Sequence, residues 1–217
     1  MSWRIQKYGE RALLLEDLEE PLRLGLARHA ESSPPEHLEE CVPGHDGLLF
    51  IFRRPVPAAR LAAWLDGAGK TAPLPAGGRL HRIEVVYDGP DLASVAEAAG
   101  LSVAEVVARH SGGSYRVRLC GFAPGFPYLD GLDPRLRLPR RDQPRTRIEP
   151  GAVAVGGPYA GIYPVAGPGG WHLLGRTDFV LFDKAAAART RFDPRAVFPL
   201  QAGDRVVFSA VEAAVRD

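Results

Sequence analysis

The stretch Gly121-Phe-Ala-Pro-Gly-Phe-Pro-Tyr-Leu129 opens the segment that decides the fold, and this segment extends to Gly170. Residues 121–170 hold ten of the 24 glycines and nine of the 20 prolines, in under a quarter of the chain. Large apolar residues are interleaved with them, whereas a flexible linker would be rich in Ser and poor in such residues. The segment is therefore expected to form ordered, tightly turned backbone that presents aromatic and arginine side chains.

The composition is typical of a globular chain, with 46% hydrophobic residues among 217 and a formal net charge of +1. A charge so close to zero gives no whole-chain field toward nucleic acid or an anionic membrane. Cys41 and Cys120 are too few for a disulfide framework or a zinc cluster. The N-terminus lacks an apolar signal core, and no apolar run approaches the roughly 18 residues of a membrane span. We expect a cytoplasmic protein with neither nucleic-acid nor membrane partners.

Residues 1–78 predict a small α+β domain whose order ββαββα places helices on one face of an antiparallel sheet. The expected elements are strands at 3–8, 12–16, 37–42 and 48–52 and helices at 20–30 and 57–65. Gly69-Lys70-Thr71 resembles the end of a phosphate-binding loop, but Trp64 stands where that motif needs Gly. Residues 70–78, with two prolines, are expected to form a linker between domains.

Residues 79–217 predict a β-rich second domain. Ser102 and Glu105 have the spacing of a capping box, which opens a helix that Gly112 and Gly113 stop. The expected elements are helices at 91–99 and 102–110 and strands at 81–87, 115–119, 152–155, 161–163, 171–174, 179–182 and 205–209. Short strands with Gly and Pro turns favour a closed or sandwiched β architecture over a doubly wound one.

A family resemblance rests on motifs in one order along most of the chain. They are residues 121–129, Pro144-Arg-Thr-Arg147, Gly161-Ile-Tyr-Pro164, Pro168-Gly-Gly-Trp171, Gly175-Arg-Thr177 and Gly203-Asp-Arg205. This set resembles the KipI family, also known as allophanate hydrolase subunit 1 or as PxpB, the B component of 5-oxoprolinase. The resemblance implies a two-domain α+β fold, with a small ferredoxin-like N-terminal domain at 1–78 and a cyclophilin-like β-barrel at 79–217.

The same resemblance implies a hydrolase subunit that is active only in a complex. With KipA-like (PxpC) and PxpA-like subunits it would open 5-oxo-L-proline to L-glutamate, using ATP with Mg²⁺ at a site shared with a partner. No biotin attachment motif is present on this chain, because Met1 is its only methionine. Two alternatives stay open: an inhibitor that binds a sensor histidine kinase, and a carboxyltransferase or allophanate hydrolase subunit in urea breakdown.

Arg145 and Arg147 are the leading anion-binding candidates. Two apart in an extended strand, they would point to the same face and offer a pair of guanidinium forks for phosphate or carboxylate. Six arginines lie between 135 and 147, and for Arg135, Arg137, Arg140 and Arg141 a solvated loop is the preferred interpretation.

His110 is the candidate general acid or base, since the end of its helix would favour its charged form. A plain capping role fits the sequence equally well. The other histidines lack ligand spacing, so we expect no metal site.

Aromatic residues and glycines of the motifs are expected to bind substrate or a partner. Phe122, Phe126, Tyr128 and Trp171 would wall a pocket for a flat ring, with packed core as the competing interpretation. Gly169 and Gly170 would offer backbone N–H groups to an anion, or form a turn. The other residues expected in this role are Pro124, Gly125, Tyr159, Tyr163 and Arg176.

Overall fold

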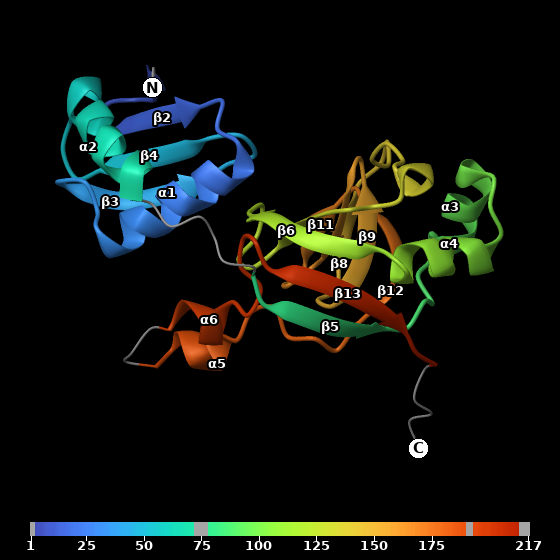
Figure 1. The fold of residues 1–217 in the computed structure, drawn as a ribbon. Coiled ribbons are helices and arrows are strands. Elements are labelled where there is room, and N and C mark those ends of the chain that lie inside the picture. The colour runs from blue at the N-terminus through green and yellow to red at the C-terminus, as the bar shows by residue number, and fades with distance from the viewer. Residues whose placement is uncertain (1–2, 72–77, 190–192, 213–217) are drawn as a thin grey trace. The chain divides into compact units, whose positions relative to one another are not determined.

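The computed structural model describes residues 3–71, 78–189 and 193–212. The chain divides into two compact units, Met1–Gly77 (unit 1) and Gly78–Asp217 (unit 2), drawn as ribbons in Figure 1. The linker expected at 70–78 falls mainly on residues 72–77, which lie outside the described residues.

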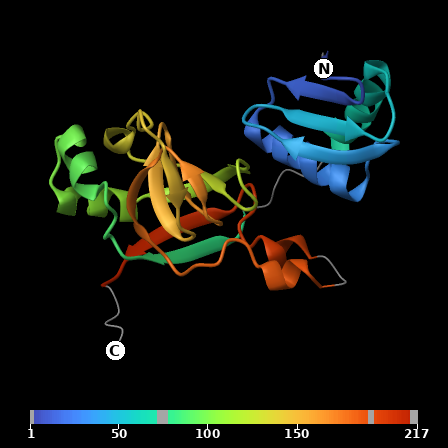
Figure 2. The ribbon, with the colours of Figure 1, turned by 180° about the vertical axis from the view of Figure 1, so that it is seen from behind.

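Unit 1 is a four-stranded antiparallel sheet with two helices. Its elements are β1 (Arg4–Lys7), β2 (Ala12–Glu16), α1 (Glu20–Ser32), β3 (Leu38–Pro43), β4 (Leu48–Phe52) and α2 (Ala58–Thr71). The strand order is β1-β2-β4-β3, and both helices lie on one face of the sheet (Figures 1 and 2). The expected order ββαββα is confirmed.

The core of unit 1 follows from the period of its strands. In β4 burial alternates along the strand, so Leu48, Phe50 and Phe52 are fully buried and their neighbours are half-buried. These side chains pack against Leu61 and Leu65 of α2, which lie four apart and so share one helix face. The spacing of apolar residues therefore determines which faces of strand and helix meet.

Unit 2 carries the remaining elements. They are β5 (Leu80–Val85), α3 (Leu92–Ala99), α4 (Val103–Ser111), β6 (Ser114–Cys120), β7 (Pro127–Asp130), the 3-10 helix η1 (Pro134–Leu136), β8 (Arg145–Ile148), β9 (Ala152–Gly156), β10 (Tyr159–Ile162), β11 (Gly167–Gly169), β12 (His172–Arg176), α5 (Lys184–Ala187), α6 (Pro194–Val197) and β13 (Arg205–Ala210).

A curled seven-stranded sheet forms the centre of unit 2, in the order β12-β9-β10-β7-β6-β13-β5 (Figure 2). Within the described part of this sheet, β13 and β5 pair in parallel and the other neighbouring strands are antiparallel. The two edge strands meet where Val86 and Arg176 exchange backbone hydrogen bonds of 2.9 Å. Gly175 permits this approach, because a Cβ there would lie 2.2 Å from the Val86 carbonyl oxygen. The sheet thus curls into a half-barrel, and β8 and β11 form a separate two-stranded ribbon.

A helical hairpin of α3 and α4 packs against the half-barrel. Gly100 ends α3 in the left-handed conformation, with φ of 62°, where glycine has no steric cost. The expected capping box opens α4, since Ser102 accepts from the Glu105 N–H and the Glu105 side chain accepts from the Ser102 N–H. Val95 of α3 and Val106 of α4 are fully buried in the main core of unit 2.

The strand expected at 179–182 is wrong. The segment has no strand pairing, although Leu181 is buried in the core. The sheet edges that it would have joined are already linked to each other at Val86 and Arg176. Its apolar side chains pack without forming a strand, and the ring of Phe182 stacks on that of Phe198 with the centroids 5.3 Å apart.

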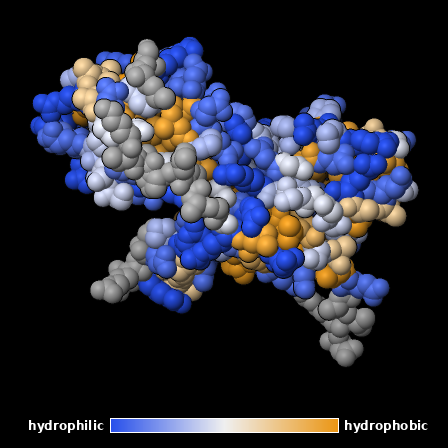
Figure 3. Space-filling view, viewed as in Figure 1, coloured by the Kyte–Doolittle hydropathy of each residue, from blue (hydrophilic) through white to orange (hydrophobic). Residues whose placement is uncertain are grey.

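Among the described residues, no helix is both long and apolar enough to cross a membrane. On the face drawn in Figure 3, hydrophilic residues predominate and hydrophobic residues form separate patches.

Candidate functional site

The motif segment of unit 2 surrounds a small pocket of about 240 Å³. Three turns and strand ends converge on it: the turn between β6 and β7, the segment before β8, and the segment from the end of β10 to the start of β12. The lining residues are Phe122, Phe126, Tyr128, Arg140, Pro144, Tyr163, Pro168, Gly169, Gly170 and Trp171. We name it the ring pocket.

Phe126 is the centre of the ring pocket. It is only 1% exposed, and its ring makes edge-to-face contacts with Tyr163 at 5.1 Å and with Trp171 at 5.3 Å. Tyr128 lies edge-on at 5.3 Å and is half-buried. Edge-to-face packing of this kind holds rings in fixed orientations. The rings therefore serve in both of the expected ways: Phe126, Tyr163 and Trp171 are packed and buried, and the pocket lies against them.

Phe122 differs from the other rings of the pocket. Its side chain is 67% exposed, and its backbone φ of 70° lies in the left-handed region, which is uncommon outside glycine. The hydrogen bonds Phe126 N–H to Ala123 O and Gly121 N–H to Phe126 O, both 3.0 Å, close the turn around it. The exposed ring of Phe122, on a constrained turn, thus forms the outer edge of the pocket.

The glycines of the motifs make room for the rings. A Cβ on Gly169 would lie 2.1 Å from the Tyr163 hydroxyl, and one on Gly156 would lie 2.6 Å from the Trp171 ring. The carbonyl of Gly170 accepts the N–H of Arg141 at 2.8 Å. The close contact therefore explains Gly169 without an anion, and the backbone of Gly170 fixes the loop that carries Arg140.

Arg140 is the cation of the pocket lining. It is exposed, and none of the hydrogen bonds or ion pairs of the described residues involves its guanidinium group. Burial raises the pKa of the Tyr163 hydroxyl, while the N–H of Trp171 and the charge of Arg140 oppose that shift. The sequence analysis placed Arg140 in a solvated loop, and no local signal separates it from the five other arginines nearby.

Arg145 forms an ion pair with Asp91 instead of extending into solvent. Its two Nη atoms donate to the two carboxylate oxygens of Asp91, each at 2.8 Å, and Arg141 Nη1 adds a third contact at 2.8 Å. The N–H of Leu173 donates to the same carboxylate at 2.8 Å. Asp91 is 3% exposed. Burial acts to raise its pKa, but the hydrogen bonds of Arg145 and Leu173 and the positive charges of Arg145 and Arg141 outweigh it and lower the pKa.

Arg147 binds a different carboxylate. Its Nε donates to Glu149 at 2.6 Å, and both side chains are 68% exposed. The paired forks expected for Arg145 and Arg147 are therefore wrong as a single anion site, because the first is engaged inside the protein and the second at its surface. Sequence reasoning missed Asp91, which lies 54 positions before Arg145 and so has no local signal.

His110 is also placed differently from expectation. It is fully buried, its ring stacks on Phe208 at 4.7 Å, and its Nδ1 lies 2.7 Å from the Tyr87 hydroxyl. Burial lowers the pKa of His110 to about 3. The charged form expected at the helix end is wrong, because desolvation outweighs the helix terminus. His110 is not among the residues that line the ring pocket.

The remaining candidates do not line the ring pocket. Gly125 has φ of 80°, and a Cβ there would lie 2.8 Å from the Leu181 carbonyl oxygen, so it shapes the turn next to exposed Pro124. Tyr159 contacts Tyr128 at 5.5 Å. Arg176 pairs with Asp88 at 2.9 Å where the sheet edges meet.

The described part of the chain contains no group of three or more His, Cys, Asp or Glu side chains that could hold a metal ion.

The fold defines the class: a mixed α/β chain with a curled half-barrel sheet. The chain belongs to the family described as "Carboxyltransferase domain, subdomain C and D", which matches residues 3–192. The expected relationship to the B component of 5-oxoprolinase is confirmed by relatives that are named as that component. The Escherichia coli O157:H7 protein is 41% identical in an alignment of 192 residues that covers 82% of this chain and 85% of that one. The Bacillus subtilis protein is 30% identical over 96% of this chain and 92% of its own length.

Solved structures show the same fold. The crystal structure of TTHA0988 matches with a TM-score of 0.79 and 37% identity, over 95% of this chain. This chain spans only 41% of that protein. The Kluyveromyces lactis urea amidolyase has a TM-score of 0.73 at 19% identity, over 97% of this chain and 15% of its own length, which shows the fold alone.

Proposed function

We propose that this chain is the B component (PxpB) of an ATP-dependent 5-oxoprolinase, which opens 5-oxo-L-proline to L-glutamate together with KipA-like (PxpC) and PxpA-like subunits. One observation carries the proposal: motifs from separate parts of the sequence converge on a single ring-lined pocket with one cation. The relatives named as the B component of 5-oxoprolinase support it, since two of them match over more than four fifths of both chains.

The ring pocket suits a small cyclic acid. A volume of about 240 Å³ lies below the roughly 300–1,000 Å³ of pockets for drug-sized ligands. A flat five-membered lactam would lie against the faces of Tyr128 and Trp171, with Phe122 over its exposed side. The guanidinium of Arg140 would then pair with the carboxylate of 5-oxoproline in the fork geometry that arginine prefers.

The ring pocket also lacks part of what the reaction needs. The carbonyl of a lactam is a poor electrophile, so its oxygen must be activated, and the developing charge needs cations and oriented N–H donors. Arg140 and the Tyr163 hydroxyl are the charged and hydroxyl-bearing groups of most use in the lining, and His110 lies outside it. We infer that a partner subunit supplies the remaining cations and the proton-transfer group, facing the exposed Phe122.

A nucleotide does not fit the ring pocket. The ring pocket is smaller than ligand pockets of ordinary size, and Gly69 lies near the end of α2 rather than after a strand, as a phosphate-binding loop requires. ATP and Mg²⁺ would bind at a site shared with a partner subunit, in a cytoplasmic complex.

We also propose that unit 1 is ferredoxin-like and that unit 2 is a cyclophilin-like barrel. A ferredoxin-like unit has the order βαββαβ, and moving its last strand to the front gives the ββαββα of unit 1. The contact between Val86 and Arg176, which links the two edges of the curled sheet, supports a cyclophilin-like barrel for unit 2. The division at Gly77 and Gly78 supports the proposal that these units are separate domains.

The test is reconstitution of the complex with the KipA-like and PxpA-like subunits. We expect 5-oxoproline-dependent ADP release with all three subunits and none with this chain alone. Arg140→Ala should raise the KM for 5-oxoproline about tenfold, because a charge-assisted contact is lost. Arg205→Ala, which removes an exposed arginine of β13 outside the pocket, is the control and should leave KM unchanged. Three folded subunits without turnover would contradict the proposal.

A carboxyltransferase in urea breakdown is the second candidate. The Saccharomyces cerevisiae urea amidolyase is 38% identical over 89 residues, which are 40% of this chain but only 5% of that protein. Activity that depends on a biotin carrier and bicarbonate, instead of 5-oxoproline, would favour this candidate.

A further inference from the structure

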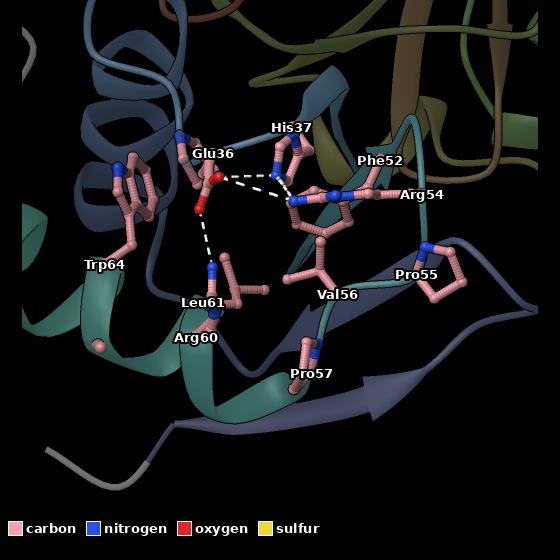
Figure 4. Close-up of a pocket in the computed structure, with 12 residues that line it drawn as sticks. Glu36, His37, Phe52, Arg54, Pro55, Val56, Pro57, Arg60, Leu61 and Trp64 are labelled. Carbon is pink, nitrogen blue, oxygen red and sulfur yellow. Dashed lines mark hydrogen bonds and ion pairs between the residues drawn. The ribbon is translucent and has the colours of Figure 1, made fainter.

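Unit 1 contains a larger hollow that the proposed function does not use. It has a volume of about 600 Å³, within the range of small-molecule pockets, and Figure 4 shows it between the segment after β4 and the first turns of α2. The residues that line it are Pro35, Glu36, His37, Phe52, Arg54, Pro55, Val56, Pro57, Arg60, Leu61, Ala63 and Trp64. We name it the unit 1 groove.

The base of the unit 1 groove is apolar. Phe52 of β4 and Leu61 of α2 reach it from the core of the unit, and both are fully buried as residues. Trp64 forms one wall (Figure 4), and its indole Nε1 donates to the Ser33 carbonyl at 3.1 Å, which fixes the ring. Such a base can take the aliphatic or aromatic body of a ligand.

The rim of the unit 1 groove is cationic. Arg60 Nη1 lies 2.8 Å from Glu36 Oε2, and Arg54 Nη2 lies 3.8 Å from Glu36 Oε1. His37 Nε2 approaches the same carboxylate at 2.7 Å, and Figure 4 shows all three side chains directed at Glu36. The first turn of α2 carries no acidic residue, so the positive end of its dipole is not offset there. One carboxylate thus faces two guanidinium groups and a histidine ring.

The backbone around His37 sets up this arrangement. Its φ of 66° lies in the left-handed region, which costs energy for a residue with a Cβ. Hydrogen bonds from Leu38 N–H to Pro35 O at 3.1 Å and from Arg53 N–H to His37 O at 2.9 Å hold the turn. Consecutive side chains of an extended strand point to opposite faces, whereas here Glu36 and His37 both face the groove.

We propose that the unit 1 groove binds a small amphipathic carboxylate. The apolar body lies against Val56, Pro57 and Trp64, above the buried side chains of Phe52 and Leu61, and the carboxylate of the ligand displaces that of Glu36 from Arg54 and Arg60. Glu36 is the chemical stand-in for the ligand, because it presents the same planar group to the same cations. The exchange is easy, since Glu36, Arg54 and Arg60 are 61–66% exposed and exposed ion pairs are weak.

The first experiment compares 4-phenylbutyrate with its neutral amide, 4-phenylbutyramide, on the full chain alone. Binding is followed by the amide and indole N–H resonances of ¹⁵N-labelled protein. We expect saturable shifts at Trp64 and Leu61 and at least about fivefold tighter binding of the acid, the effect of roughly one exposed ion pair. Equal binding of acid and amide, or no saturable shift at these residues, would overturn the proposal.

Glu36→Gln is the decisive variant. Because it removes the competing carboxylate and leaves the shape unchanged, it should tighten binding of the acid by about two- to fivefold and leave binding of the amide unchanged. Glu39→Gln on β3 is the matched control, since Glu39 is 51% exposed and does not line the groove. Weaker or unchanged binding of the acid to Glu36→Gln would contradict the role given to Glu36.

The variant Arg54→Ala/Arg60→Ala should abolish the preference for acid over amide, whereas Arg53→Ala, outside the lining, should retain it. An acid preference that survives the double substitution would refute the cationic rim. The measurement needs no partner subunit and no turnover, so its outcome is independent of the proposed function.

Discussion

Two arginines on one short strand occupy opposite environments. Arg145 of β8 is bound by Asp91, which is 3% exposed, and by the same contact it joins α3 to the ribbon of β8 and β11. Arg147, two residues on, pairs with Glu149 in open solvent. Both cations are arginines of one strand, so the burial of the carboxylate partner makes the first pair part of the framework and the second a surface contact.

The largest effect is expected at the buried pair. Asp91→Asn leaves the half-buried guanidinium groups of Arg145 and Arg141 without their carboxylate, and breaking a buried pair from one side costs about 3 kcal/mol. Chemical unfolding of the full chain should therefore show that loss for unit 2. Asp88→Asn is the matched control, because Asp88 forms an exposed pair with Arg176. Equal losses of unfolding free energy in the two variants would show that burial does not determine how much an ion pair contributes to stability.

His110 extends the comparison to a buried group that lost its charge. Its pKa in the folded chain is about 3, below the roughly 6.5 of an unfolded histidine. The unfolded state therefore binds more protons between these pH values. The contribution of neutral His110 to the free energy of unfolding is complete above pH 6.5 and falls on acidification by about 1.4 kcal/mol per pH unit. The difference in unfolding free energy between the wild type and His110→Gln, measured from pH 7 to pH 4.5, should shrink accordingly. A constant difference would mean that His110 does not titrate in this way.

The smallest effect is expected at the exposed pair. Arg147→Ala removes a fully solvated contact with Glu149, so the unfolding midpoint should stay within experimental error of the wild type. The same substitution should leave the KM of the reconstituted complex unchanged, because Arg147 does not line the ring pocket. A clear rise in KM would restore Arg147 as a binding residue.

Much of the fold could be predicted from local sequence. The strand pairs of unit 1, the capping box at Ser102 and Glu105, and the strands at 115–119 and 152–155 all rest on periodicity or turn chemistry within a few residues. The prediction of a strand at 179–182 was wrong, because alternating apolar residues are compatible with a buried strand and also with an irregular segment packed on the core. What decided it was the meeting of two sheet edges, which depends on residues 90 positions apart at Val86 and Arg176.

The candidate site could be predicted in part. Seven of the expected residues line the ring pocket, because aromatic and glycine motifs are visible in sequence: they are Phe122, Phe126, Tyr128, Tyr163, Gly169, Gly170 and Trp171. The charged residues were less accessible to this reasoning. Arg140 lines the pocket and Arg145 does not, and only long-range contacts with Asp91 and the carbonyl of Gly170 separate them.

By itself the sequence determined most of the longer helices and strands, the family motifs and the ring-rich character of the segment from Gly121 to Gly170, since periodicity, capping and turn chemistry are local. The tertiary structure alone decided which charges are buried and with what partner. The reason is physical: desolvation and ion pairing depend on three-dimensional neighbours, as the buried carboxylate of Asp91 and the neutral ring of His110 show.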